Sequence, residues 1–164
     1  QMVGPAYVSL VFRAAREMGV HSCQDAAGFL NANFSEESID DLDLCLLDVK
    51  SGDERTYHTV TGGTLAPTIA FGERLARHGK KIWVRFVLVP GLTDSYENVE
   101  NVAEICERFS SAVEHIDVLG FHQLGRPKWH ELRIPYPLEH QKGPSAALKK
   151  RVSEQFERHG FVVY

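Results

Sequence analysis

Three short apolar runs of this sequence end in polar side chains that could bind a ligand: Asp25, the pair Asp48 and Lys50, and His122. If these runs are parallel strands, the side chains meet at the C-terminal edge of one sheet, where α/β folds place their chemistry. Asp48 and Lys50 are two positions apart, so they leave their strand on the same face. Each residue also has a structural explanation, as a turn cap, a surface ion pair or a structural histidine. Their coincidence at one edge favours a site.

Arg85 is a fifth candidate, because it lies in the middle of the strongly apolar run 81–89. A guanidinium in a buried strand must be paired or bound to an anion, since an isolated buried charge is costly. One reading is an internal salt bridge to a carboxylate at the strand ends. The other is an anion site, because the guanidinium fork suits carboxylate groups. The sequence leaves both readings open.

Strands and helices are predicted to alternate along the chain, and three helices end in a Gly directly before a strand: Gly19, Gly79 and Gly160. The predicted strands are 20–25, 42–50, 81–89, 115–122 and 161–164, with the run 42–50 covered on both faces. The predicted helices are 5–18, a short one within 31–41 capped by Ser35, 64–78, 93–109 and 144–159, with a short amphipathic piece in 51–63.

This alternation predicts an α/β fold with about five parallel strands joined by right-handed crossovers. A closed eight-stranded barrel takes about 250 residues. We therefore expect residues 1–164 to form a single domain that is either part of a (β/α) barrel or an open sheet. Residues 123–143 carry three prolines and an aromatic cluster, and a loop of that length is usually a lid, a cover or a binding segment.

Composition narrows the class of protein. Hydrophobic residues make up 43% and charged residues 24%, and the formal net charge is −4, which argues against a nucleic-acid or anionic-membrane surface. No apolar run is long enough to span a membrane, and the N-terminus lacks a signal-peptide layout, so a cytoplasmic location is expected. The three cysteines, Cys23, Cys45 and Cys106, have no metal-ligand spacing.

Four stretches of the sequence together carry a family resemblance: Gly19 to Asp25, Leu47 to Lys50, Trp83 to Asp94 followed by Glu97-Asn98, and Leu119 to Trp129. They resemble the pyruvate formate-lyase-activating enzymes, members of the radical S-adenosylmethionine (SAM) enzymes. The resemblance covers nearly the whole chain in order and includes the specific His122 segment.

The resemblance implies a fold and an activity. The fold is the C-terminal part of a TIM-barrel-like radical SAM (β/α) barrel. In the family, a 4Fe-4S cluster reduced by flavodoxin or ferredoxin donates an electron to SAM, and the resulting radical takes a hydrogen from a backbone glycine of pyruvate formate-lyase. By similarity, Asp48, Lys50 and His122 contact SAM and Arg85 lies in the same cavity. Asp25 with Asp48 would hold a monovalent cation.

Two departures from the family pattern limit this reading. Relatives usually have Asp-Thr-Asn-Gly where this chain has Asp25-Ala26-Ala27-Gly28, so the cation site is in doubt beyond Asp25. The Cys-x3-Cys-x2-Cys motif and a Gly-Gly-Glu segment are absent, which predicts that the chain is a fragment without cluster ligands or an assignable catalytic residue. We expect this fragment to be inactive alone and prone to self-association.

Two alternatives remain open at this stage. The chain could be a non-catalytic domain that binds a partner protein through residues 123–143. It could also belong to an activating enzyme for a different glycyl-radical enzyme, since no residue of the sequence identifies the partner.

Overall fold

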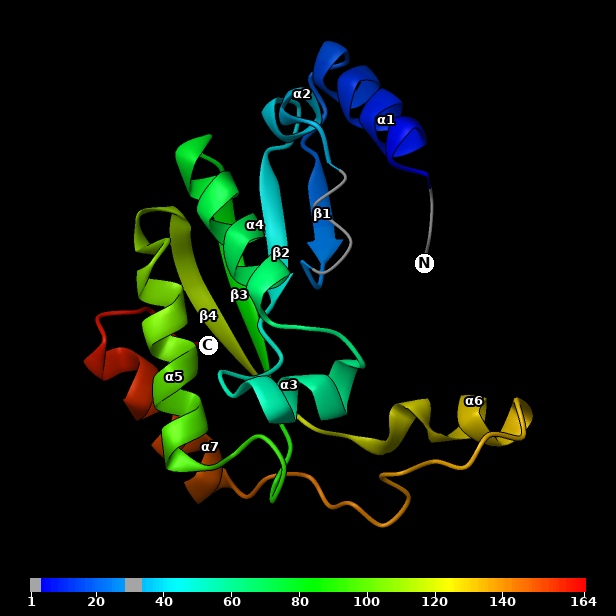
Figure 1. Cartoon of the computed structure of the whole chain (residues 1–164), viewed down its shortest axis with the longest axis vertical. Helices are drawn as coiled ribbons and strands as arrows, with labels where there is room; N and C mark the ends of the chain where they lie inside the picture. Colours follow the sequence, from blue (N-terminus) through cyan, green and yellow to red (C-terminus); the bar gives the residue numbers. More distant parts are fainter. Residues whose placement is uncertain (1–3, 29–33) are drawn as a thin grey trace.

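A four-stranded parallel sheet forms the centre of the computed structural model, which describes residues 4–28 and 34–164. Its strands lie in the order β1-β2-β3-β4 (Figure 1). Their bounds are β1 Cys23–Ala26, β2 Leu44–Asp48, β3 Lys81–Leu88 and β4 Val113–Gly120. All three neighbouring pairs run parallel, which confirms the predicted α/β class.

Helices occupy the connections between the strands, as the alternation predicts (Figure 1). Gly19, Gly79 and Gly160 each follow a helix with positive φ, of 67°, 63° and 85°, which confirms them as helix stops. The α-helices are α1 Pro5–Glu17, α2 Glu36–Asp40, α3 Glu54–Thr61, α4 Ala66–Arg77, α5 Tyr96–Glu107, α6 Arg126–Glu131 and α7 Ala146–Arg158, with 3₁₀ turns η2 Ser110–Ala112 and η3 Gln123–Gly125.

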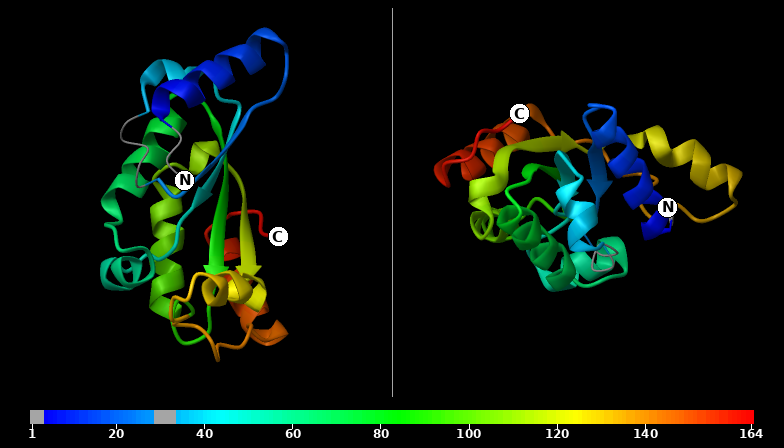
Figure 2. Two further views of the ribbon diagram at one scale, coloured as in Figure 1. Left: turned by 90° about the vertical axis from the view of Figure 1, so that its right-hand side faces the viewer. Right: turned by 90° about the horizontal axis from the view of Figure 1, so that it is seen from above.

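The two faces of the sheet differ. On one face, alternate residues of β3 are completely buried against the helices, among them Phe86, whose ring lies 5.7 Å from that of Phe156 in α7. Figure 2 shows α4 and α5 on that side of the strands. On the other face, Trp83, Arg85 and Val87 are only half-buried. In β2, Leu46 and Asp48 are likewise half-buried between buried neighbours, so the expectation that the run 42–50 is covered on both faces is wrong in this structure.

The predicted fifth strand is reduced to a single bridge. Val163 forms a parallel bridge with Ile116 of β4. The backbone hydrogen bonds between the C-terminal segment and β4 join residues 162–164 to residues 116–118. The other four strands are present in the predicted order. β1 and β2 are shorter than predicted, β3 ends one residue earlier, and β4 has the predicted length but lies two residues earlier in the sequence. The sheet is thus four-stranded, with the C-terminal segment lying along β4.

Helix α5 begins later than predicted, at Tyr96 rather than at Thr93, with Ser95 as its N-cap. The reason is that Thr93 and Asp94 serve the preceding turn. The Thr93 hydroxyl accepts a hydrogen bond from the Val89 N–H (2.8 Å) and donates one to the Val87 carbonyl (2.9 Å). The Asp94 carboxylate accepts from the Gly91 N–H (2.6 Å), so neither residue is free to start the helix.

Helix α1 buries less of its apolar side than its sequence spacing predicts. Phe12 is buried, but Val11 and Met18 face solvent, as do Tyr7 and Leu10. These side chains form exposed apolar surface on the helix. Whether it causes self-association stays a prediction. The short helix predicted within 31–41 is present as α2 with Ser35 as its N-cap, while residues 31–33 lie outside the described residues.

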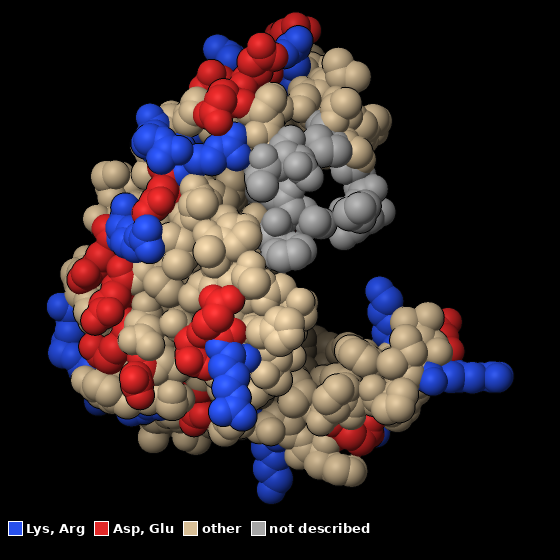
Figure 3. Space-filling view, viewed as in Figure 1, with Lys and Arg blue, Asp and Glu red and all other residues tan. Residues whose placement is uncertain are grey.

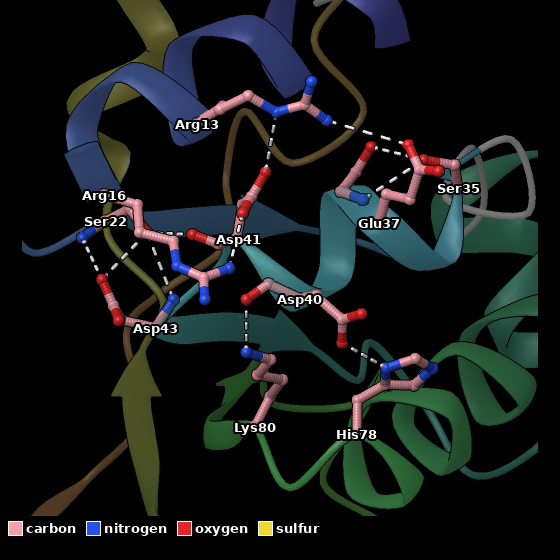
Figure 4. Close-up of polar contacts among 11 residues, drawn as sticks. Arg13, Arg16, Ser22, Ser35, Glu37, Asp40, Asp41, Asp43, His78 and Lys80 are labelled. Carbon is pink, nitrogen blue, oxygen red and sulfur yellow. Dashed lines mark hydrogen bonds and ion pairs between the residues drawn. The ribbon is translucent and has the colours of Figure 1, made fainter.

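Ion pairs and hydrogen bonds hold the helices at the N-terminal edge of the sheet (Figure 4). Arg16 of α1 lies 2.8 Å from the Asp41 carboxylate beyond α2. Asp40 accepts hydrogen bonds from Lys80 at its carbonyl (2.8 Å) and contacts the His78 ring at its carboxylate (2.7 Å). This edge is opposite the one where Asp48 and Lys50 lie, so these contacts stabilise the fold away from the candidate site.

His159, at the C-terminal end of α7, joins that helix to α5. Its Nδ1 lies 2.7 Å from Glu107 and its Nε2 lies 3.1 Å from Glu100. The hydrogen bonds to Glu107 and Glu100 raise the pKa of His159, and those from Gln155 and His159 lower the pKa of Glu100. The stabilisation from His159 is complete below the unfolded His pKa of about 6.5 and is lost as pH rises through the raised folded value.

The pH dependence of stability tests this contact. The contribution of Glu100 is complete above its unfolded pKa of about 4.3 and is lost as pH falls through the lowered folded value. The wild type should therefore be more stable than His159→Gln near pH 5.5, and the difference should shrink toward pH 9. Urea unfolding of both proteins at the two pH values measures it. A difference that is the same at both would contradict the assignment.

Candidate functional site

Four of the predicted site residues form a charge cluster on the half-buried face of the sheet: Asp25, Asp48, Lys50 and Arg85. Asp48 is its centre. The Lys50 Nζ lies 2.8 Å from Asp48 Oδ2, and the Arg85 Nε donates to Asp48 Oδ1 at 2.9 Å. The Arg85 Nη2 also donates to Asp25 Oδ1. The structure thus brings together residues from three adjacent strands that are far apart in sequence.

Strand register explains this convergence. Asp48, the last residue of β2, is directly opposite Arg85 of β3. Leu47 and Val49, on either side of it in sequence, are completely buried on the helix side, so Asp48 and Lys50 must point to the other face. The Val49 N–H donates to the Arg85 carbonyl at 3.1 Å, which extends the pairing past the end of β2.

The cluster is partly shielded from water. The side chains of Asp48, Lys50 and Arg85 are 13%, 25% and 21% exposed, whereas Asp25 at the edge of the sheet is 64% exposed. Burial opposes the charge on Arg85, but the nearby carboxylates of Asp48 and Asp25 raise the pKa of Arg85 above its ordinary value. Two carboxylates and two cations that are close together and half-shielded suit a ligand carrying both a carboxylate and an ammonium group.

The sequence left two readings of Arg85 open, an internal salt bridge and an anion site. The structure contains the salt bridge. Its guanidinium bonds to both carboxylates proposed for the monovalent cation, Asp25 and Asp48. In this arrangement the carboxylates already have a positive partner and do not form an open cation site. Among the described residues, no group of three Asp, Glu, His or Cys side chains could hold a metal ion. The cation stays a prediction without structural support.

His122 lies at the same edge but does not contact the charge cluster in the part of the chain that is described. It follows β4 by two residues, is exposed, and accepts a hydrogen bond from the Leu124 N–H through its Nδ1 (3.4 Å), at the start of η3. The fourth strand thus ends two residues earlier than predicted, at Gly120, and a role of His122 toward a ligand stays a prediction.

Asp117 and His115 of β4 lie on the same face and were missed from the sequence. Asp117 is opposite Arg85 and His115 is opposite Trp83, with their rings 4.6 Å apart. His115 Nε2 lies 3.4 Å from Asp117 Oδ1. The signal that could have found them is the alternation with Ile116 and Val118, which are buried on the helix side.

The cysteines do not fit an iron–sulfur cluster. Cys23 is exposed on β1, while Cys45 on β2 and Cys106 on α5 are buried. Burial raises the pKa of Cys45 and Cys106, which keeps both thiols protonated, although cluster ligands are thiolates. The described part of this chain therefore supplies no cluster ligands, and no reaction step through a cluster can be derived from it.

Comparison with known proteins adds the family. No protein-family model matches the chain. It is 30% identical to the pyruvate formate-lyase 1-activating enzyme of Escherichia coli K12 over 154 residues, which covers 93% of this chain and 62% of that enzyme. It is 36% identical to the pyruvate formate-lyase-activating enzyme of Streptococcus mutans over 145 residues, 85% of this chain and 55% of that enzyme. The chain is homologous to the pyruvate formate-lyase-activating enzymes. It spans about 60% of the length of these relatives.

Solved structures show the same fold. A domain of the pyruvate formate-lyase-activating enzyme from Bacteroides vulgatus superposes with a TM-score of 0.77 at 18% identity, over 98% of this chain and 89% of that one. Streptococcus suis SuiB bound to SAM superposes with a TM-score of 0.64 at 12% identity, over 94% of this chain and 33% of that one. SuiB bound to its precursor peptide SuiA gives a TM-score of 0.67 at 13% identity, with coverage of 94% and 33%. The four-stranded α/β unit is thus shared with radical SAM proteins, as expected for part of a barrel.

Two further observations concern the surface. No helix in the described part of the chain has the length and apolar character needed to cross a lipid bilayer. Figure 3 shows Lys and Arg side chains interspersed with Asp and Glu over the face that it displays, in keeping with the small formal net charge of −4.

Proposed function

We propose that this chain is the SAM-binding, C-terminal part of a glycyl-radical-enzyme activating protein. The whole protein would reductively cleave SAM and remove a hydrogen from a backbone glycine of pyruvate formate-lyase. The observation that carries the proposal is the charge cluster around Asp48, on the half-buried sheet face of a chain homologous to these activating enzymes. This chain alone would be inactive, because its cysteines do not fit the cluster that supplies the electron.

The charges of the cluster fit the amino-acid end of SAM. The Lys50 ammonium would bind the carboxylate of SAM, and the Asp48 carboxylate would accept hydrogen bonds from its amine. Arg85 would hold Asp48 in place, with its second hydrogen bond fixing Asp25. His122, at the end of β4, would contact SAM from the other side of the sheet edge.

The protein that receives the radical would approach the same edge of the sheet. In the proposal it is pyruvate formate-lyase or another glycyl-radical enzyme, with flavodoxin or ferredoxin as the reductant. SuiB, a structural neighbour, is known with a peptide bound, which supports peptide binding by a protein of this fold. The proposed location is cytoplasmic, and neither nucleic acid nor membrane is a proposed partner.

A second candidate function rests on residues 123–143, the arm that projects from the body in Figure 1. Instead of the predicted loop, the arm contains η3 and α6 and is closed at its base by Gln123, whose amide nitrogen donates to the carbonyls of Leu138 (2.7 Å) and Gln141 (2.8 Å). Leu124, Leu132 and Ile134 on it are exposed. Such a surface favours protein binding, which a non-catalytic domain could also use.

Activity of the full-length parent tests the main proposal. Reconstituted without oxygen with iron and sulfide, the parent should cleave SAM under reductant. Lys50→Ala and His122→Ala should each weaken SAM binding about 10- to 100-fold, the loss expected for one hydrogen bond to a charged group. Lys150→Ala, on the exposed side of α7, is the control and should bind like the wild type. If both site variants bind and cleave SAM like the wild type, the assignment is wrong.

A further inference from the structure

The loop that follows Lys50 is held by one buried side chain of α5, Asn98. Its Oδ1 accepts three hydrogen bonds: from the Ser51 hydroxyl (2.6 Å), the Gly52 N–H (2.9 Å) and the Asp53 N–H (3.2 Å). Asn98 is 3% exposed and Ser51 is completely buried. A single amide oxygen therefore accepts from three groups immediately after Lys50, and Ser51 and Asp53 also bond to each other (3.0 and 3.1 Å).

Asn98 is itself fixed to the turn that follows β3. Its Nδ2 donates to the Thr93 carbonyl at 2.7 Å, and Thr93 is in turn bonded to the backbone of Val87 and Val89. Arg85 belongs to this same strand. The side chain of Asn98 thus connects the strand that carries Arg85 to the loop that carries Lys50.

Close packing leaves the loop little freedom. A Cβ added to Gly52 would lie 2.5 Å from the Val102 nitrogen and 2.5 Å from the Asn101 Cβ, so the loop backbone touches α5 directly. On the other side of Lys50, the Val49 N–H donates to Arg85. Both neighbours of Lys50 are therefore held to structure belonging to β3 and α5, and its side chain reaches Asp48 from a fixed backbone.

We propose that Asn98 is a positioning residue, which sets the place of the Lys50 ammonium beside Asp48 without touching the ligand. The inference deepens the proposed function, because Lys50 is the residue assigned to the carboxylate of SAM. Its structural part is independent of SAM, since it concerns only the contacts that Asn98 and Lys50 make within this chain. In the sequence, Asn98 was noted only as part of a stretch that resembles the activating enzymes, and its contacts with residues 51–53 were not predicted.

The first experiment uses this chain without SAM. In Asn98→Ala, we expect the Lys50 amine to react about tenfold faster with an amine-acylating reagent, and the Gly52 and Asp53 amides to exchange faster with solvent. The control is Ser95→Ala, which removes the N-cap hydrogen bond to the Asn98 N–H and weakens the same helix. Equal Lys50 reactivity in the wild type and Asn98→Ala would overturn the proposal, as would equal acceleration in Ser95→Ala.

The second experiment measures SAM affinity in the full-length parent. Asn98→Ala should weaken SAM binding about tenfold, while Asn98→Asp, which keeps an oxygen for the three donors but loses the Nδ2 donor to the Thr93 carbonyl, should lose less than Asn98→Ala. Equal losses in the Ala and Asp variants would overturn the role of the oxygen. If the wild-type parent binds no SAM, the proposed function fails, whereas the Lys50 reactivity still decides whether Asn98 positions that side chain.

Discussion

Asp48→Ala should destabilise this chain by about 2 kcal/mol and abolish measurable SAM binding by the full-length parent. The variant leaves Lys50 and Arg85 facing each other without the carboxylate between them. Breaking a fully buried pair costs about 3–5 kcal/mol and breaking an exposed pair about 0–1 kcal/mol. The ion pairs of Asp48 with Lys50 and Arg85, whose side chains are 13% to 25% exposed, lie between these limits.

Glu114→Ala is a matched control for Asp48→Ala. The Glu114 carboxylate also has a Lys partner, Lys81 at 2.7 Å, and a second donor, Trp83 at 2.7 Å, but the side chains of Lys81 and Glu114 are 65% and 39% exposed. We expect a loss below about 1 kcal/mol there. Urea unfolding measures both variants.

A double variant tests the physical reason. Adding Arg85→Gln to Asp48→Ala removes one of the two cations, and it should restore part of the lost free energy of unfolding, because the variant no longer keeps two positive charges side by side. Strictly additive losses in free energy of unfolding would show that Asp48 and Arg85 are not coupled. Equal losses in Asp48→Ala and Glu114→Ala would likewise contradict a special contribution of the cluster.

The polar strand ends could be predicted because strand order and polarity follow from local patterns. Parallel strands bring their C-terminal ends to one edge, so Asp25, Asp48 and Lys50 could be grouped before any contact was known. The ends of the helices could also be predicted from local sequence, since a Gly after a helical pattern of apolar residues can adopt the positive φ that ends the helix. These parts of the fold are confirmed.

The faces of the sheet could not be predicted from the sequence. Leu46, Trp83 and Val87 are apolar but lie on the half-buried face, so the strands read as continuous apolar runs although only one face is fully covered. For the same reason Arg85 was taken for a residue inside a buried run, and Asp117 was overlooked. In β4 the alternation with Ile116 and Val118 is visible in the sequence, whereas in β2 and β3 the half-buried face is identified only when register places each residue opposite its neighbours.

Side-chain contacts within and between loops also could not be predicted from the sequence. Thr93 and Asp94 have the composition of a helix start, but their side chains bond to the preceding turn and move the start of α5 to Ser95 and Tyr96. The local propensity of Thr93 and Asp94 to start a helix is therefore overridden by hydrogen bonds that exist only in the folded chain. The hydrogen bonds of Asn98 to residues 51–53 depend on the same turn, because the Asn98 side chain is bonded to the Thr93 carbonyl.

Gly52→Ala should destabilise the chain by about 3 kcal/mol although it changes no charge. The new Cβ would lie 2.5 Å from the Val102 nitrogen and 2.6 Å from the Asn101 carbonyl carbon, and both belong to the backbone of α5. A helix backbone cannot yield as a flexible side chain can, so either the loop or the helix must shift. Gly125→Ala is the control, because its Cβ would meet no atom within 4 Å, and its loss should stay within about 0.5 kcal/mol.

Whether the loop or helix α5 moves in Gly52→Ala decides whether the contacts of Asn98 and Lys50 change as well. If the loop moves away from α5, the three hydrogen bonds to Asn98 lengthen and Lys50 leaves Asp48, so Gly52→Ala and Asn98→Ala disturb the same contact. Their combined loss in free energy of unfolding should then be smaller than the sum of the single losses. If the losses add instead, the loop is held to α5 at two independent points. Lys50 would then keep its place when either one is lost, contrary to the role assigned to Asn98.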